Sequence, residues 1–232
     1  MSDTVLLITG ASSGIGAETA RQAAKAGHRV VLAARSTDRV EQLANELGGS
    51  DRALAVACDV NDERSQQAMV EATLNRFGRI DAVFANAGIG GSPGGFSGAD
   101  PVRWKEMILT NIYGVGLTLR CTIQALKETR GHLLLTGSAA GRATIAGSMY
   151  SATKWAVSAI GYGVREELRG TGIRVTLIEP GMVDTPFFDE KPPYSLQPAD
   201  VAAAVLYAIS QPAHVDVNEI LVRPTPPIDE GS

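Results

Sequence analysis

Tyr150 and Lys154 stand four positions apart in the segment YSATK. In a helix, residues at this spacing lie on one face, so a single ligand can contact both side chains. A phenol has a pKa of about 10, but a nearby ammonium group stabilises the phenolate and lowers that pKa. The pair therefore predicts a general acid and base tuned by Lys154. The same spacing is also typical of an ordinary polar helix face.

Two further polar residues can join this pair. Ser138 follows a predicted strand, and its hydroxyl can bond the oxygen of a reacting carbonyl group, or it can cap a loop. Asn111 lies in a predicted helix and offers both a donor and an acceptor, enough to hold an ordered water beside the lysine. These four residues form the candidate catalytic site.

A glycine-rich segment, TGASSGIG, joins the first predicted strand to the first predicted helix. Its glycines allow a tight turn and let the backbone approach a pyrophosphate at the helix N-terminus. The alternative is a glycine-rich turn that binds nothing. We predict that the segment binds a dinucleotide through Gly10, Ser12, Ser13, Gly14, Ile15 and Gly16.

The end of the second predicted strand favours NADP over NAD. A carboxylate at this place would hold a ribose 2′-hydroxyl, whereas a cation would hold a 2′-phosphate. The sequence there has Arg35 and Ser36 and no carboxylate, and a guanidinium suits phosphate. Alternatively Arg35 is a solvated surface charge and Asp38 is the ribose ligand. Asp38 fits better in the first turn of the next helix, where its charge complements the helix dipole.

These residues need a scaffold of alternating strands and helices. Short apolar runs alternate with longer amphipathic segments, which is typical of parallel strands covered on both faces. The predicted strands are Thr4–Thr9, Arg29–Ala34, Ala53–Ala57, Ile80–Ala85, Gly131–Thr136, Arg174–Glu179 and Glu219–Val222. The predicted helices are Gly14–Ala26, Asp38–Leu47, Asp62–Phe77, Pro101–Glu128, Ser148–Leu168 and Ala199–Ile209. The fold class is α/β, a Rossmann-type doubly wound parallel sheet of seven strands, and residues 1–232 form one domain.

Composition excludes several classes of protein. The 232 residues are 44% hydrophobic and carry a net charge of −4, so neither disorder nor general nucleic-acid binding is expected. No apolar run is long enough to span a membrane, and two cysteines make no disulfide framework, so we expect a cytoplasmic protein. His28, His132 and His214 fall in unrelated segments, which argues against a metal site.

Taken together, these motifs resemble the short-chain dehydrogenase/reductase family, in its branch of roughly 250 residues with TGxxxGxG and YxxxK motifs. The resemblance extends over essentially the whole chain. The motifs are carried by Thr9, Gly10, Gly14, Gly16, Asn86, Ala87, Gly88, Asn111, Ser138, Tyr150, Lys154, Pro180, Gly181 and Thr185. Ser138 and Tyr150 are twelve positions apart where thirteen is usual, so the wall between them is one residue shorter.

The resemblance implies reversible hydride transfer between a nicotinamide and a carbonyl or CH–OH carbon. By this resemblance Tyr150 gives a proton to the carbonyl oxygen, Ser138 positions that oxygen, and Lys154 binds the nicotinamide ribose. Asn111 would hold a water of the proton relay, and Arg35 would take the 2′-phosphate of NADP. The remaining expected cofactor contacts are Asp59, Val60, Asn86, Ala87, Gly88, Pro180, Gly181, Val183 and Thr185.

The substrate is less defined by the sequence. Phe96, Met149, Met182, Phe187, Phe188 and Tyr194 are expected to line an apolar pocket for a ketone, aldehyde or secondary alcohol. Arg142 or Lys191 could instead bind a substrate carboxylate, or both are solvated surface charges. The segment from Val215 to Thr225 resembles that of NADP-dependent 3-hydroxy acid (serine) dehydrogenases.

Two further expectations concern partners and turnover. The resemblance implies a homotetramer or homodimer that pairs the long fourth and fifth helices, with no nucleic acid and no membrane. The alternative to an enzyme is an NADP(H)-sensing binding protein with the same fold and no turnover.

Overall fold

The sheet is built from seven short apolar strands. The computed structural model describes residues 4–91, 93–188, 190 and 192–227. All strand pairs are parallel, in the order β3-β2-β1-β4-β5-β6-β7. The strands are β1 Val5–Thr9, β2 Arg29–Ala34, β3 Ala53–Ala57, β4 Ala82–Ala85, β5 His132–Thr136, β6 Arg174–Pro180 and β7 Glu219–Val222. The predicted fold class is confirmed, and each strand begins and ends within two residues of its prediction.

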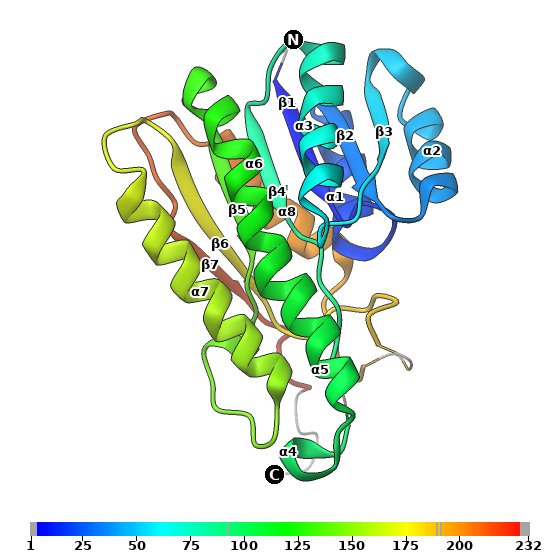
Figure 1. Ribbon diagram of the computed structural model, residues 1–232, viewed down its shortest axis with the longest axis vertical. Coiled ribbons are helices and arrows are strands. Elements are labelled where there is room, and N and C mark those ends of the chain that lie inside the picture. Colours follow the sequence, from blue (N-terminus) through cyan, green and yellow to red (C-terminus); the bar gives the residue numbers. More distant parts are fainter. Residues whose placement is uncertain (1–3, 92, 189, 191, 228–232) are drawn as a thin grey trace.

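Helices cover both faces of this sheet. In Figure 1, α3, α6 and α7 lie in front of the sheet, and α1 and α8 lie behind it. The main helices are α1 Gly14–Lys25, α2 Thr37–Glu46, α3 Glu63–Phe77, α5 Pro101–Ile108, α6 Gly114–Thr129, α7 Met149–Glu167 and α8 Pro198–Ser210. A short helix that the sequence did not predict, α4, spans Gly95–Gly98.

Two apolar cores result, one on each face of the sheet. Leu133 and Leu135 point into the core under α3, α6 and α7, while Leu134 points into the core under α1 and α8. This alternation follows from the two-residue period of a strand. The strands are apolar on both faces because helices cover both, and Leu133, Leu134 and Leu135 are all fully buried.

The predicted helix Pro101–Glu128 is interrupted. A π-helical turn, η2 Leu109–Tyr113, separates α5 from α6 without a change of direction. Such a turn inserts one extra residue and is frequent at functional sites. It contains Asn111, whose buried side chain it turns toward the loop after β4. The prediction of one regular helix was therefore wrong at this turn.

The strand order reverses at β1, whose neighbours are β2 on one side and β4 on the other. Ligands of doubly wound sheets bind at such a point, outside the carboxyl ends of the strands. The loops after β1 and β4 meet there. They carry Gly10 and Ala87, which lie so close that a Cβ on Gly10 would stand 2.8 Å from the Ala87 Cα.

Candidate active site

A large cavity opens at the carboxyl ends of the strands. Its volume is about 1460 Å³, larger than the roughly 300–1,000 Å³ of typical single-ligand pockets. Of the predicted cofactor contacts, all except Gly16 line it. Of the predicted catalytic residues, Ser138, Tyr150 and Lys154 line it and Asn111 does not. Sequence motifs from six strand ends are thus brought to one cavity.

The glycine-rich segment makes a tight cradle at one wall of this cavity. Gly10 has a φ of +68°, a conformation that favours glycine. A Cβ on Gly16 would stand 2.4 Å from the Gly10 carbonyl oxygen, so the first turn of α1 packs directly against the loop. Gly16 therefore does not line the cavity, but its lack of a side chain lets the loop and α1 pack together.

The N-terminus of α1 faces the cavity. Ser13 is its N-cap residue, and no side chain in the described part of the protein caps the helix there. The first backbone N–H groups of a helix have no partner within the helix, and the helix dipole favours an anion at that end. Together with the glycine cradle, this uncapped end fits the pyrophosphate of a dinucleotide.

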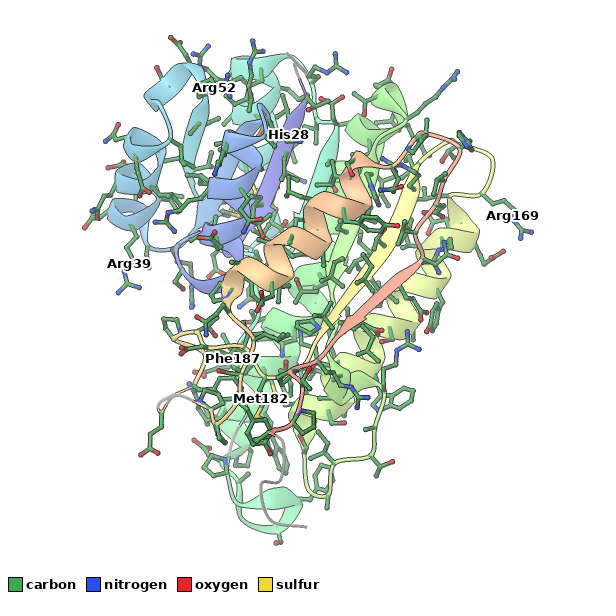
Figure 2. The ribbon with its side chains drawn as sticks, turned by 180° about the vertical axis from the view of Figure 1, so that it is seen from behind. His28, Arg39, Arg52, Arg169, Met182 and Phe187 are labelled. Atoms are coloured by element: carbon green, nitrogen blue, oxygen red, sulfur yellow. The ribbon has the colours of Figure 1, made fainter. Side chains whose placement is uncertain are left out.

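Two arginines line the cavity beyond the end of β2. Arg35 and Arg39 are both exposed there, together with Ser36. Asp38 stands in the first turn of α2 and is not among the lining residues. Figure 2 shows Arg39 projecting from α2, while Phe187 and Met182 lie past the lower end of α8. The sequence analysis missed Arg39. Its position four residues after Arg35, about one helical turn further along the chain, could have indicated it.

Tyr150 and Lys154 occupy the first turns of α7, one helical turn apart. The Lys154 side chain is 4% exposed, and its ammonium donates to the Thr136 carbonyl at 2.8 Å. The ammonium stands 5.7 Å from the centre of the Tyr150 ring. Gly88 borders the same group, because a Cβ on it would lie 3.7 Å from Lys154 Nζ.

Burial dominates the acid–base properties of this pair. Burial raises the pKa of the Tyr150 phenol to about 12, although hydrogen bonding with Ser138 acts in the opposite direction. Burial also lowers the pKa of the Lys154 ammonium to about 8. The sequence predicted a lowered pKa for Tyr150, and this prediction was wrong for the protein without a ligand. It counted the neighbouring charge and left out desolvation.

Ser138 lies between β5 and α7. Its hydroxyl accepts from the Ala140 N–H at 3.1 Å and caps the 3₁₀ turn η3 Ala139–Gly141. It also donates to the Pro180 carbonyl at 3.4 Å. The capping interpretation is therefore confirmed, and because the hydroxyl also borders the cavity, its bond to a reacting carbonyl oxygen stays a prediction.

Asn111 and Asn86 hold backbone segments in place. Asn111 Nδ2 donates to the Ile89 carbonyl and to the Thr153 hydroxyl, both at 3.1 Å. Its Oδ1 accepts from the Ile89 N–H at 2.9 Å. Asn86 Nδ2 donates to the Thr9 carbonyl at 3.0 Å. Since both N–H bonds of the Asn111 amide are used, its expected role in holding a water stays a prediction.

The wall near Tyr150 is apolar. The Phe187 ring meets the Tyr150 ring edge-on, with 5.5 Å between the ring centres. The other apolar side chains of this wall are Ala143, Ile145, Met182 and Phe188. Phe96, Met149 and Tyr194 were expected here but do not line the cavity. Phe96 packs on Trp104 instead.

Arg142, one of the two cations proposed for a substrate carboxylate, is not found in that role. Arg142 pairs with Glu179 and Glu219 and does not line the cavity. Its pairing with two carboxylates corrects the interpretation as a substrate-carboxylate ligand, while its side chain stays 31% exposed to solvent, as the surface-charge interpretation expects. Lys191 lies outside the described residues. The cavity is also bordered by Arg103 of α5 and by Arg223, which directly follows β7, and the sequence analysis assigned neither of them to the site.

The residues that the structure describes include neither a metal-binding group nor a membrane-spanning helix. None of their His, Cys, Asp and Glu side chains gather in a group that could hold a metal ion. None of the helices they form is both long and apolar enough to cross a membrane.

Comparisons with known proteins agree with this geometry. Residues 4–194 match the family model described as short chain dehydrogenase. An uncharacterized oxidoreductase of Staphylococcus saprophyticus is 38% identical, over 97% of this chain and 98% of that protein.

Three solved structures are similar over nearly the whole chain. An alcohol dehydrogenase from the archaeon Thermococcus sibiricus, complexed with 5-hydroxy-NADP, superposes with a TM-score of 0.90 at 34% identity, covering 98% of this chain and 100% of that one. A 3-ketoacyl-(acyl-carrier-protein) reductase from Brucella melitensis, complexed with NADH, superposes with a TM-score of 0.87 at 33% identity, covering 95% of this chain and 96% of that one. Serine dehydrogenase from Escherichia coli superposes with a TM-score of 0.86 at 31% identity, covering 94% of this chain and 97% of that one.

Proposed function

Because the chain belongs to the short-chain dehydrogenase family, we propose that it is an NADP(H)-dependent oxidoreductase acting on a carbonyl group or a secondary alcohol. The observation that carries this proposal is that Tyr150, Lys154 and Ser138 border the same cavity as the glycine cradle. The bound nicotinamide would supply or accept the hydride. The chain's own residues bind, orient and move the proton.

Tyr150 is the proton donor for reduction. With a pKa of about 12, its phenol is protonated at neutral pH and ready to give a proton to a carbonyl oxygen. The Ser138 hydroxyl lies beside it and orients that oxygen by a hydrogen bond. In the direction of alcohol oxidation the phenolate is needed, and the Lys154 ammonium stabilises it.

Lys154 has a second role in holding the cofactor. Its ammonium already donates to the Thr136 carbonyl and keeps further N–H bonds for ribose hydroxyls. Asn111 supports this site from behind, because it fixes the loop of Gly88 and Ile89 beside the ammonium.

The preference for NADP(H) rests on charge beyond β2. Arg35 and Arg39 border the cavity and Ser36 adds a hydroxyl, whereas Asp38 does not border it. Guanidinium groups bind phosphate with paired N–H donors, so this end favours a 2′-phosphate over a free ribose hydroxyl.

The substrate meets a mainly apolar wall. Phe187 meets the Tyr150 ring edge-on, and Met182 and Phe188 line the same cavity. A small or medium ketone, aldehyde or secondary alcohol fits this wall. The proposal also includes hydroxy acids similar to the substrates of 3-hydroxy acid dehydrogenases.

We extend the proposal to the organisation of the protein. The whole chain of 232 residues forms one domain, supported by the single sheet that its described strands form. Two or four copies pair through α6 and α7, and on α7 the aromatic side chains of Trp155 and Tyr162 are exposed. Cys58 and Cys121 are free thiols, which supports a cytoplasmic location.

A carbonyl panel with NADPH tests the function. Wild type should oxidise NADPH with at least one ketone or aldehyde, and Tyr150→Phe should bind NADPH without oxidising it. Tyr207→Phe, changed on the outer side of α8, is the matched control and should behave as wild type. Binding of NADPH by the wild type without turnover of any carbonyl would support the alternative of a cofactor-sensing protein.

A further inference from the structure

A fully buried carboxylate stands behind the loop that carries Ser138. Glu179, near the end of β6, is 0% exposed. Arg142, four residues after Ser138, donates from Nε to both carboxylate oxygens at 2.8 Å. Its Nη2 lies 2.8 Å from Oε2 as well. A guanidinium and a carboxylate joined in this way have a fixed relative orientation.

The pair is tied to two further elements. Glu219 of β7 is the second carboxylate partner of Arg142. The Ser158 hydroxyl of α7 lies 3.1 Å from Glu179 Oε1 and 3.3 Å from the Lys154 carbonyl. We call Arg142, Glu179, Glu219 and Ser158 the Arg142 cluster. It joins the loop after β5 to β6, to β7 and to the helix that carries the catalytic pair.

The loop has little room to move against this cluster. A Cβ on Gly137 would stand 2.8 Å from Glu179 Cγ, and one on Gly141 would stand 2.8 Å from the Lys154 carbonyl oxygen. Ser151, next to Tyr150, donates to the Ala140 carbonyl at 2.7 Å. The backbone on both sides of Ser138 is therefore pressed against β6 and α7.

Stability alone is a poor reason for such a cluster. The Glu179 carboxylate is fully desolvated while the Arg142 side chain stays 31% exposed, and the cost of desolvating the carboxylate offsets much of the attraction between the two charges. What it supplies is geometry. Neither Arg142 nor Glu179 lines the cavity, so neither is placed to touch a cofactor or substrate that binds there.

We propose that Glu179 and Arg142 are positioning residues that set the place of the Ser138 hydroxyl relative to Tyr150. They act on the rate of the chemical step and not on cofactor binding. The inference rests on the proposed function, because it needs Ser138 and Tyr150 to act on one carbonyl oxygen.

The test compares Glu179→Gln with a matched control. Glutamine keeps the size of the side chain but offers one acceptor oxygen where Arg142 needs two. We expect kcat to fall roughly ten- to hundredfold, as for a misplaced catalytic group, while the dissociation constant of NADPH stays within about twofold. Asp216→Asn is the control, because Asp216 lies 3.9 Å from Arg165 of α7 and accepts from the Val175 N–H, away from the loop. It should lower stability and leave kcat unchanged.

Two readouts separate positioning from simple loss of folded protein. Rates are divided by the number of NADPH-binding sites, so unfolded molecules do not count. With NADPH deuterated at the transferred position, the isotope effect on kcat should rise in Glu179→Gln, because the chemical step becomes slower relative to product release. Arg142→Lys keeps the charge without the paired N–H donors, so it should be intermediate in kcat. That variant carries the test if Glu179→Gln does not fold.

Several results would overturn the inference. It fails if kcat per binding site and the isotope effect equal those of wild type in both variants. If wild type is active and Tyr150→Phe is not, that failure leaves the proposed function intact. If wild type reduces no carbonyl, both the proposed function and this inference fall.

Discussion

Arg35→Ala should weaken NADPH binding and leave NADH binding unchanged. A hydrogen bond between a guanidinium and a phosphate contributes about 1.5–3 kcal/mol when it is shielded. Arg35 is exposed, so solvent reduces its expected contribution to about 1–2 kcal/mol. This free energy corresponds to a rise of roughly 5- to 30-fold in the dissociation constant of NADPH. NADH has no 2′-phosphate and should lose nothing.

Fluorescence titration of both cofactors measures this prediction. The NADPH-specific loss should shrink at high ionic strength, because the interaction is between exposed charges. Arg39→Ala should give a second, smaller NADPH-specific loss. Arg64→Ala is the control, since Arg64 is exposed on α3 and does not line the cavity. Equal dissociation constants for NADPH and NADH in wild type, or an equal loss for both in Arg35→Ala, would refute the reasoning.

Three further predictions address the cradle, the lysine and a buried histidine. Gly16→Ala should weaken binding of both cofactors by roughly tenfold or more, because its Cβ would stand 2.4 Å from the Gly10 carbonyl oxygen; titration that shows unchanged affinity would contradict the packing. Since the Lys154 pKa is about 8, NADPH binding by the wild type should weaken as pH rises through that value. Lys154→Met should bind NADPH weakly at every pH. A wild-type affinity for NADPH that is the same below and above pH 8 would contradict the role of the ammonium in binding. Burial lowers the pKa of His132 to about 3 from 6.5, so the unfolded chain binds more protons between these values and stability falls as pH falls through this window. Urea midpoints at acid and neutral pH should therefore differ less for His132→Gln than for wild type, and the control His214→Gln should keep the wild-type difference.

The strands and the cradle were predictable because their signals are local. Runs such as Leu133–Leu135 are apolar at every position, which is typical of a strand covered on both faces. Gly10 and Gly16 are needed because side chains would collide with neighbouring backbone, and the spacing of the glycines carries that information. Tyr150 and Lys154 share a helix face for the same local reason.

The remaining features depend on contacts between distant residues. The π-helical turn at Asn111 adds a single residue to a long helix, and hydrophobic periodicity does not detect one extra residue. Arg142 and Glu179 are 37 positions apart in the sequence, so they come into contact only when β5 and β6 pair. The pKa of Tyr150 depends on burial, which the sequence around it does not specify.

The central claim is that the Tyr150 hydroxyl delivers the proton. A single-turnover measurement with enzyme in excess over NADPH, and a carbonyl substrate found in the panel, follows this step without product release. We expect Tyr150→Phe to lower the rate of NADPH oxidation at least about a hundredfold, with NADPH affinity close to wild type. A Tyr150→Phe rate within a few-fold of wild type would contradict the account.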